Sequence, residues 1–209
     1  MTDEPSARRA ITRDKLVTAA ITVFAERGVQ GATVEQVCET AGFTRGAFYS
    51  NFASVNELCV AILDHWTQAY LEVARSTIAE ILTTMPAMPV DLDQLLRFGV
   101  NLLLTTQGDD RTTILARIAL RLHAIRDADF RADHRTLVAD AGLYFMGMVE
   151  QATKAYGYRF NVTLEQATTM INGVFEMGAL DDMLRDRETT TAARAEVLVI
   201  LLRSMLEPV

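Results

Sequence analysis

The sequence has little of what interrupts helices and little of what binds metal ions. Its 209 residues include 4 prolines, 11 glycines, 2 cysteines and 3 histidines. So few prolines and glycines favour long helices. The histidines and cysteines follow no zinc-ligand spacing, so we expect no metal site and no cofactor. Cys38 and Cys59 occupy apolar positions of expected helices, which favours packing over a redox switch.

Long apolar runs, targeting signals and catalytic motifs are also missing. The longest candidate run, residues 197–202, is far shorter than the roughly 18 residues that cross a bilayer. The N-terminal stretch MTDEPSARRA lacks the apolar segment of a signal peptide. We therefore expect a cytoplasmic protein with no membrane partner. HExxH, GxSxG, GxGxxG and phosphate-loop patterns are absent, so we expect no catalytic residues, and an all-helical enzyme is kept only as an alternative.

Charge is divided unevenly along the chain. The net charge is −7, but residues 1–52 contain six basic and six acidic side chains, a balance of 0, so the whole deficit lies in the remainder. Four of the basic residues, Arg8, Arg9, Arg13 and Lys15, lie close to the N-terminus. A basic arm of this kind suits contact with phosphates, while the acidic remainder stays clear of the duplex.

Residues 33–52, TVEQVCETAGFTRGAFYSNF, read as two short helices around a glycine turn. Thr33 and Gln36 have the spacing of a capping box that begins the first helix. Gly42 follows the last apolar position, where a left-handed residue ends a helix. Thr44 then caps the second helix. The pattern predicts a helix-turn-helix, with an ordinary pair of amphipathic helices as the alternative.

The second helix of this pair has two different faces. Phe48 and Phe52 fall on the side expected to be buried, and Arg45, Gly46 and Tyr49 fall on the opposite arc. An exposed arginine and tyrosine beside a bare glycine backbone suit the groove of a nucleic acid.

The remaining sequence predicts helices and no strands. The fold class is all-α, with about nine helices: a three-helix N-terminal helix-turn-helix domain, residues 1–53, joined by a long helix to a C-terminal helical bundle within residues 54–209. Residues 127–134 are charged and predict no clear element. Besides the helix-turn-helix pair, helices are expected at 12–27, 55–84, 91 or 93 to 107, 110–125, 137–156, 163–185 and 191–206.

The last helix is apolar on all sides over residues 197–202, so both of its sides need cover. One side can pack on the bundle. We predict that a second copy of the chain covers the other side. Gly173 and Gly178 on the preceding helix would permit close approach. A last helix buried within its own bundle is the alternative. The predicted interface residues are Met170, Val174, Gly178, Val197, Ile200 and Leu201.

Residues 12 to about 58 resemble the DNA-binding domain of the TetR family of bacterial transcription regulators. The matching features are Arg13, Ala19-Ala20 with Phe24 and Gly28, Thr33-Val34, Ala41-Gly42, Thr44-Arg45-Gly46, Tyr49-x-x-Phe52 and Ser54-x-x-Glu57-Leu58. The resemblance implies a homodimer joined through the last two helices, two helix-turn-helix units on a palindromic double-stranded DNA operator, and an effector pocket in the C-terminal domain.

By position, the resemblance also implies which residues contact DNA. Thr44, Arg45 and Gly46 would approach base edges or the backbone at the start of the recognition helix, whereas Thr33, Tyr49 and Asn51 would contact phosphates and sugars, with Arg13 as a further contact. Two positions depart from the family pattern: Asn51 replaces a common histidine, and Val55 replaces a usual lysine.

The expected function is therefore a ligand-responsive regulator, most simply a repressor that a small hydrophobic or aromatic effector releases from its operator. A TetR-like protein controlled by a protein partner is the alternative. Apolar and soft side chains with a few polar tips suit such an effector. The predicted lining is Trp66, Tyr70, Phe98, His123, Tyr144, Phe145, Met148 and Phe175.

Overall fold

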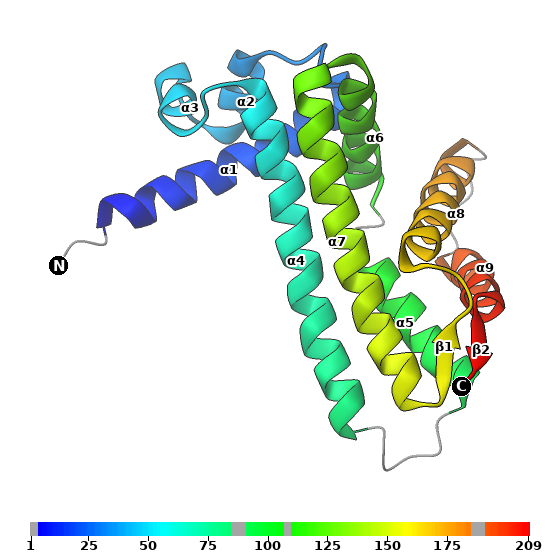
Figure 1. Cartoon of the computed structure of the whole chain (residues 1–209). Helices are drawn as coiled ribbons and strands as arrows, with labels where there is room; N and C mark the ends of the chain where they lie inside the picture. Colours follow the sequence, from blue (N-terminus) through cyan, green and yellow to red (C-terminus); the bar gives the residue numbers. More distant parts are fainter. Residues whose placement is uncertain (1–3, 85–90, 107–109, 185–190) are drawn as a thin grey trace. The chain divides into compact units, whose positions relative to one another are not determined.

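The computed structural model of the chain describes residues 4–84, 91–106, 110–184 and 191–209 (Figure 1). This part of the chain is almost entirely helical, which confirms the all-α class. Its elements in order are α1 (Glu4–Arg27), α2 (Val34–Ala41), α3 (Arg45–Asn51), α4 (Val55–Thr84), α5 (Leu92–Thr106), α6 (Arg111–Arg126), α7 (Ala128–Ala155), β1 (Tyr158–Phe160), α8 (Leu164–Leu184), α9 (Thr191–Ser204) and β2 (Leu206–Pro208).

The chain divides into two compact units. The first contains residues up to Trp66 together with Asp110–Leu137, and the second contains Thr67–Asp109 and Val138–Val209. Helices α4 and α7 therefore contribute residues to both units. Because α6 packs on α1, the unit that holds the helix-turn-helix is larger than the predicted domain of residues 1–53. The division of function between the two parts of the chain stays a prediction.

Local capping forms the helix-turn-helix as the sequence predicts. The Thr33 hydroxyl accepts from the Gln36 amide at 3.3 Å, and the Gln36 side chain accepts from the Thr33 amide at 2.9 Å. Gly42 ends α2 with φ +73°, in the left-handed region that favours glycine. The Thr44 hydroxyl accepts from the amide of Ala47 at 3.4 Å and begins α3. These bonds satisfy backbone groups that a helix end leaves unpaired.

Packing in the first unit fixes the position of α3. The side chains of Leu16 and Phe24 from α1 and of Phe48 from α3 are almost fully buried, as is Phe52 directly after α3. Each such burial stabilises the fold by about 1.5–3 kcal/mol. The recognition helix is only seven residues long, so this packing rather than its own hydrogen bonds holds it in place.

Both cysteines are buried in this unit. Burial, and secondly the charge of Asp127, raises the pKa of the Cys59 thiol to about 12. Burial likewise raises the pKa of Cys38. A protonated, buried thiol is a poor nucleophile, which supports the packing interpretation.

Three expectations about secondary structure are wrong. Helix α1 begins at Glu4, well before residue 12. Helix α7 begins at Ala128 rather than at residue 137. The Asp127 carboxylate accepts from the amide of Phe130 at 2.8 Å, and Phe130 is fully buried. The charged residues after Asp127 are thus a capped first turn with a solvated face, not an irregular segment.

The third error concerns strands. Tyr158–Phe160 pairs antiparallel with Leu206–Pro208, in the register Phe160 to Leu206. Strands of three residues are too short to display an alternating pattern. Their pairing joins segments far apart in the sequence, so only the tertiary structure reveals it.

The second unit has its own core. Helix α9 packs against both α5 and α8, as Figure 1 shows. The buried residues of this core lie on α4, α5, α7, α8 and α9 and include Tyr70, Leu96, Val100, Phe145, Met146, Ile171, Phe175, Leu198 and Leu202.

Candidate DNA-binding surface and effector cavity

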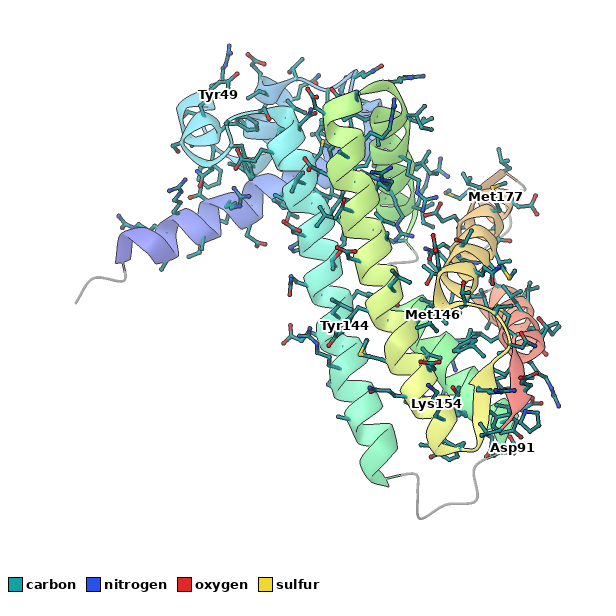
Figure 2. The ribbon with its side chains drawn as sticks, viewed as in Figure 1. Tyr49, Asp91, Tyr144, Met146, Lys154 and Met177 are labelled. Carbon is teal, nitrogen blue, oxygen red and sulfur yellow. The ribbon has the colours of Figure 1, made fainter. Side chains whose placement is uncertain are left out.

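Helix α3 exposes the residues predicted to read DNA. The Arg45 side chain is 60% exposed and Tyr49 is 53% exposed, whereas Phe48 between them is fully buried. Figure 2 shows Tyr49 at the outer side of α3. A Cβ at Gly46 would meet only the Thr44 hydroxyl, at 3.7 Å, so the backbone is open there. One face of α3 is thus anchored and the other is free for contact.

Arg45 is held in place by two neighbours. Its Nη1 lies 2.6 Å from Oε1 of Glu35 on α2, and its guanidinium lies 5.9 Å from the centre of the Tyr49 ring. Tyr49 first, and then Glu35, raise the pKa of Arg45, so the guanidinium keeps its charge. Glu35 thus engages one donor nitrogen of the Arg45 guanidinium.

Two arginines of α1 hold the C-terminal end of α3. Arg9 donates to the carbonyl of Ser50 at 3.1 Å, and Arg13 donates to the carbonyl of Asn51 at 2.8 Å. The Arg13 guanidinium also lies 4.3 Å from the centre of the Phe52 ring. Cations at the C-terminus of a helix satisfy its unpaired carbonyls and interact favourably with its dipole. These arginines therefore position the recognition helix.

Two predicted DNA contacts already have hydrogen-bond partners within the chain. Arg13 is engaged with the end of α3 rather than free for a phosphate. Asn51 is only 6% exposed, and its amide donates to the Ala47 carbonyl at 2.8 Å. Its side chain therefore braces α3. Thr33 remains exposed beside its capping bonds, so it stays a predicted phosphate contact.

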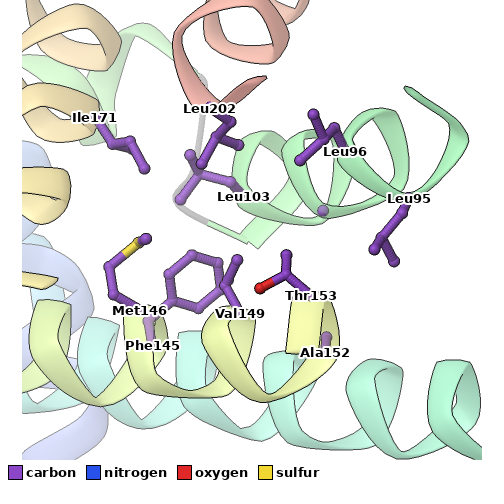
Figure 3. A pocket seen from close by; sticks show the side chains of 11 residues that line it. Leu95, Leu96, Leu103, Phe145, Met146, Val149, Ala152, Thr153, Ile171 and Leu202 are labelled. Carbon is purple, nitrogen blue, oxygen red and sulfur yellow. The ribbon is translucent and has the colours of Figure 1, made fainter. Parts of the chain in front are cut away.

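The second unit contains a small cavity of about 40 Å³ between α5 and α7. In Figure 3 the α7 side chains point across it toward α5, α8 and α9. Its lining residues are Leu95, Leu96, Gly99, Leu103, Phe145, Met146, Val149, Ala152, Thr153, Ile171 and Leu202.

Of the predicted effector contacts, only Phe145 lines this cavity. Tyr70 packs on Phe145 with their ring centres 4.9 Å apart, and both belong with Phe175 to the core. Met148 packs against the same core, and Phe98 is half-buried on α5 outside the lining. Tyr70, Phe145, Phe175 and Met148 thus belong to the core or pack against it, and their contact with an effector stays a prediction.

Three other predicted contacts lie elsewhere. Tyr144 is 47% exposed, and its hydroxyl accepts from Nε of Arg75 at 3.1 Å. Trp66 and His123 belong to the first unit. The sequence-based prediction favoured aromatic residues, whereas the lining is mostly aliphatic and therefore indistinguishable from core in a sequence. The one local signal was a glycine, Gly99, within an apolar stripe of α5.

His123 belongs to a polar network in the first unit. A nitrogen of its ring lies 2.8 Å from the side-chain oxygen of Asn56, whose amide donates to Asp127 at 3.2 Å. The ring also stacks on Phe130 at 5.2 Å between centres. Burial lowers the pKa of His123 while Asp127 opposes the shift. Hydrogen bonding to the Phe130 amide, more than any other cause, lowers the pKa of Asp127. The network ties α4 to α6 and α7.

Comparison with known proteins agrees with the helix-turn-helix geometry. Residues 16–62 match the family described as bacterial regulatory proteins, tetR family. Over 69 residues the chain is 38% identical to the HTH-type transcriptional regulator TtgR of Pseudomonas putida, a match that covers 33% of each protein. The helix-turn-helix region of the chain therefore belongs to the TetR family.

Two further regulators extend the comparison. The HTH-type transcriptional repressor KstR2 of Mycolicibacterium smegmatis is 36% identical over 61 residues, or 29% of each chain. The crystal structure of FadR from Bacillus subtilis in complex with stearoyl-CoA superposes with a TM-score of 0.72 and 16% identity, covering 90% of this chain and 96% of that one. The sequence matches thus span about a third of these regulators, and the structural match shows the fold.

Helix α9, which is outside the matched region, buries one side and exposes the other. Leu198 and Leu202 are buried in the core, while Val197 is 51% and Ile200 61% exposed. Leu201 is half-buried against the core. The apolar circumference of α9 therefore leaves an outward apolar strip.

Helix α8 also exposes apolar side chains, which together with those of α9 are called the outward strip. Met170 is 43% exposed, and Met177, which the sequence-based prediction missed, is 65% exposed (Figure 2). Val174 packs against the core. A Cβ at Gly178 would lie 3.0 Å from Cδ of Arg194 on α9. Gly178 thus permits close approach of α8 and α9 within the chain, and its place in a partner interface stays a prediction.

Within the described ranges no helix is both long and apolar enough to cross a bilayer. Among the same residues, no three His, Cys, Asp or Glu side chains are grouped so that they could hold a metal ion.

Proposed function

We propose that this protein is a transcription regulator that binds a palindromic double-stranded DNA operator as a homodimer and represses transcription until a small apolar effector binds. The observation that carries the proposal is the outward face of α3. Arg45, Gly46 and Tyr49 are exposed there while the opposite side of the helix is anchored in the core.

Arg45 is the proposed sequence reader. A bidentate arginine contact to guanine discriminates between bases by roughly 5- to 150-fold. Tyr49 and Thr33 are proposed to contact phosphates or sugars, and Thr44 and Gly46 to allow close approach at the start of α3. In a dimer, two recognition helices about 34–36 Å apart would enter successive major grooves.

The outward strip of α8 and α9 supports the homodimer. Exposed apolar side chains gathered on one surface mark an interaction site, and the strip contains Met170, Met177, Val197 and Ile200. A Cβ at Gly173 would meet no atom within 4 Å, so this position leaves room for a second copy.

The cavity of the second unit supports an effector. Ligand sites in proteins are usually about 300–1,000 Å³, whereas this cavity measures about 40 Å³. An effector must therefore enlarge it, and a ligand that prefers the enlarged form shifts the population of conformations away from the one that binds DNA. One structural relative, FadR, was crystallised with stearoyl-CoA, and KstR2 is named a repressor. The small volume is also the observation that favours the alternative, control by a protein partner.

The DNA assignment is tested by substitution on α3. Duplexes selected from a random pool by the wild-type protein serve as the operator, and affinity is measured by fluorescence anisotropy. We expect Arg45→Ala to weaken specific binding by roughly 5- to 150-fold and Tyr49→Phe to weaken it less. Arg111→Ala, which removes an exposed arginine at the start of α6, is the control. Unchanged affinity in both α3 variants would exclude α3 as the reading surface.

A further inference from the structure

The cavity of the second unit is lined by hydrocarbon. Ten of its eleven lining residues are glycine or carry aliphatic, methionine or phenylalanine side chains, and the eleventh is Thr153. The Thr153 hydroxyl already donates to the Glu150 carbonyl at 3.0 Å. A charged group entering this space would lose its hydration without an opposite charge in the lining, and a hydroxyl would have only the Thr153 oxygen as a side-chain acceptor.

The cavity is also small. Holding one water molecule needs about 10–15 Å³ of comparable volume, so about 40 Å³ holds roughly three groups of that size. The space therefore suits the end of a hydrocarbon chain rather than a complete effector.

Gly99 is the unusual member of the lining. It lies one helical turn from both Leu95 and Leu103, on the α5 face that lines the cavity. Glycine inside a helix is less stable than alanine. Its φ is not positive, since the positive-φ glycines of the described chain are Gly28, Gly42 and Gly157. A Cβ at Gly99 would meet no atom within 4 Å.

Neither backbone conformation nor crowding therefore requires glycine at residue 99. Because residue 99 has no side chain, it leaves free space at the edge of the cavity. We propose that this cavity receives the uncharged hydrocarbon end of the effector and that Gly99 sets how far this end can enter. The proposal rests on the proposed function, because it takes the bound molecule to be the effector. The polar part of that molecule then lies outside the cavity.

Two probe molecules of equal chain length test the chemical class. 1-Hexanol has one apolar end, whereas 1,6-hexanediol carries a hydroxyl at both ends and must bury one of them to enter. Titration calorimetry on the full chain is expected to give a dissociation constant for 1-hexanol at least tenfold lower than that for 1,6-hexanediol. Equal affinities, or no binding of 1-hexanol, would overturn the proposal.

Substitution at Gly99 tests the location. Gly99→Leu is expected to weaken 1-hexanol binding at least tenfold, and Gly99→Ala to weaken it by a smaller factor. Gly147→Leu is the matched control, because Gly147 is also a helical glycine of this unit with no atom within 4 Å of its Cβ, and it is outside the lining. Circular dichroism checks that each variant is folded. If Gly99→Leu is not folded, Gly99→Ala decides alone, and binding as tight as in the wild type overturns the proposal.

The same samples separate this inference from the proposed function. DNA affinity, measured with the selected duplex, reports on the regulator. Loss of 1-hexanol binding in Gly99→Leu with no effect of 1-hexanol on DNA affinity would support the cavity and count against its role in regulation. DNA binding without any 1-hexanol binding would overturn the inference and leave the DNA assignment standing.

Discussion

Replacing Glu35 by glutamine is expected to strengthen DNA binding. In the free protein Glu35 lies 2.6 Å from the Arg45 guanidinium, so Arg45 must leave this partner before it can contact a base. The carboxylate also places a negative charge on the surface that meets phosphates. Glutamine keeps the shape of the side chain and removes that charge.

The expected gain is modest, because both side chains are exposed, Arg45 by 60% and Glu35 by 54%. Exposed ion pairs of this kind contribute little, which corresponds to a gain of about 1.4- to 5-fold when the pair no longer competes. Glu35 lies within the roughly 8 Å screening length of any phosphate that approaches Arg45. We therefore expect a total gain of about two- to tenfold at physiological salt.

Anisotropy titrations of the selected duplex measure this gain over a range of salt concentrations. The slope of log affinity against log salt should stay as in the wild type, because no new cation contacts a phosphate. Glu39→Gln, an exposed carboxylate on the same helix without an ion pair to Arg45, is the control and should gain less. In an Arg45→Ala background, the gain from Glu35→Gln should shrink to its long-range part.

An equal gain with and without Arg45 would show that the two side chains do not compete. Weaker binding by Glu35→Gln would show that Glu35 positions Arg45 for DNA. Either result would refute the claim that Glu35 competes with DNA for Arg45.

Two further predictions concern assembly and pH. Ile200→Glu, at a 61% exposed position of α9, should turn the proposed dimer into a folded monomer in sedimentation velocity. The control Ile125→Glu, at a 67% exposed position of α6, should leave the dimer intact. A dimer that persists in Ile200→Glu would exclude this surface as the interface. Burial, and secondly the charge of Arg121, lowers the pKa of His134 below 6.5. At low pH the unfolded chain therefore binds more protons than the folded chain. The contribution of His134 to the free energy of unfolding should be complete above about pH 6.5 and should decrease at lower pH. His134→Gln should reduce this fall between pH 7.5 and 5.5 in urea titrations, and an unchanged fall would assign it to other groups.

The turn of the helix-turn-helix depends on neighbours in sequence, and its prediction was accurate. Thr33 with Gln36, Gly42 and Thr44 form the turn of the helix-turn-helix through bonds that span only a few residues. The start of α7 was missed although its signal is equally local. Asp127 stands three residues before Phe130, in the position of a helix cap.

Where structure depends on contacts between distant segments, the sequence alone was insufficient. Arg13 and Asn51 match DNA contacts by position, but Arg13 donates from α1 to the carbonyl of Asn51, and the Asn51 amide donates to the Ala47 carbonyl within α3.

The sequence by itself therefore determined the helix-turn-helix, because its capping bonds and apolar periodicity depend on a few neighbouring residues. Only the tertiary structure decided which apolar residues of the core border the cavity. That distinction depends on how well four helices fill the space between them, and Leu103 beside the cavity reads in the sequence like Val100, which is outside the lining. The close contact between Gly178 and Arg194 of α9 likewise follows only from the tertiary structure.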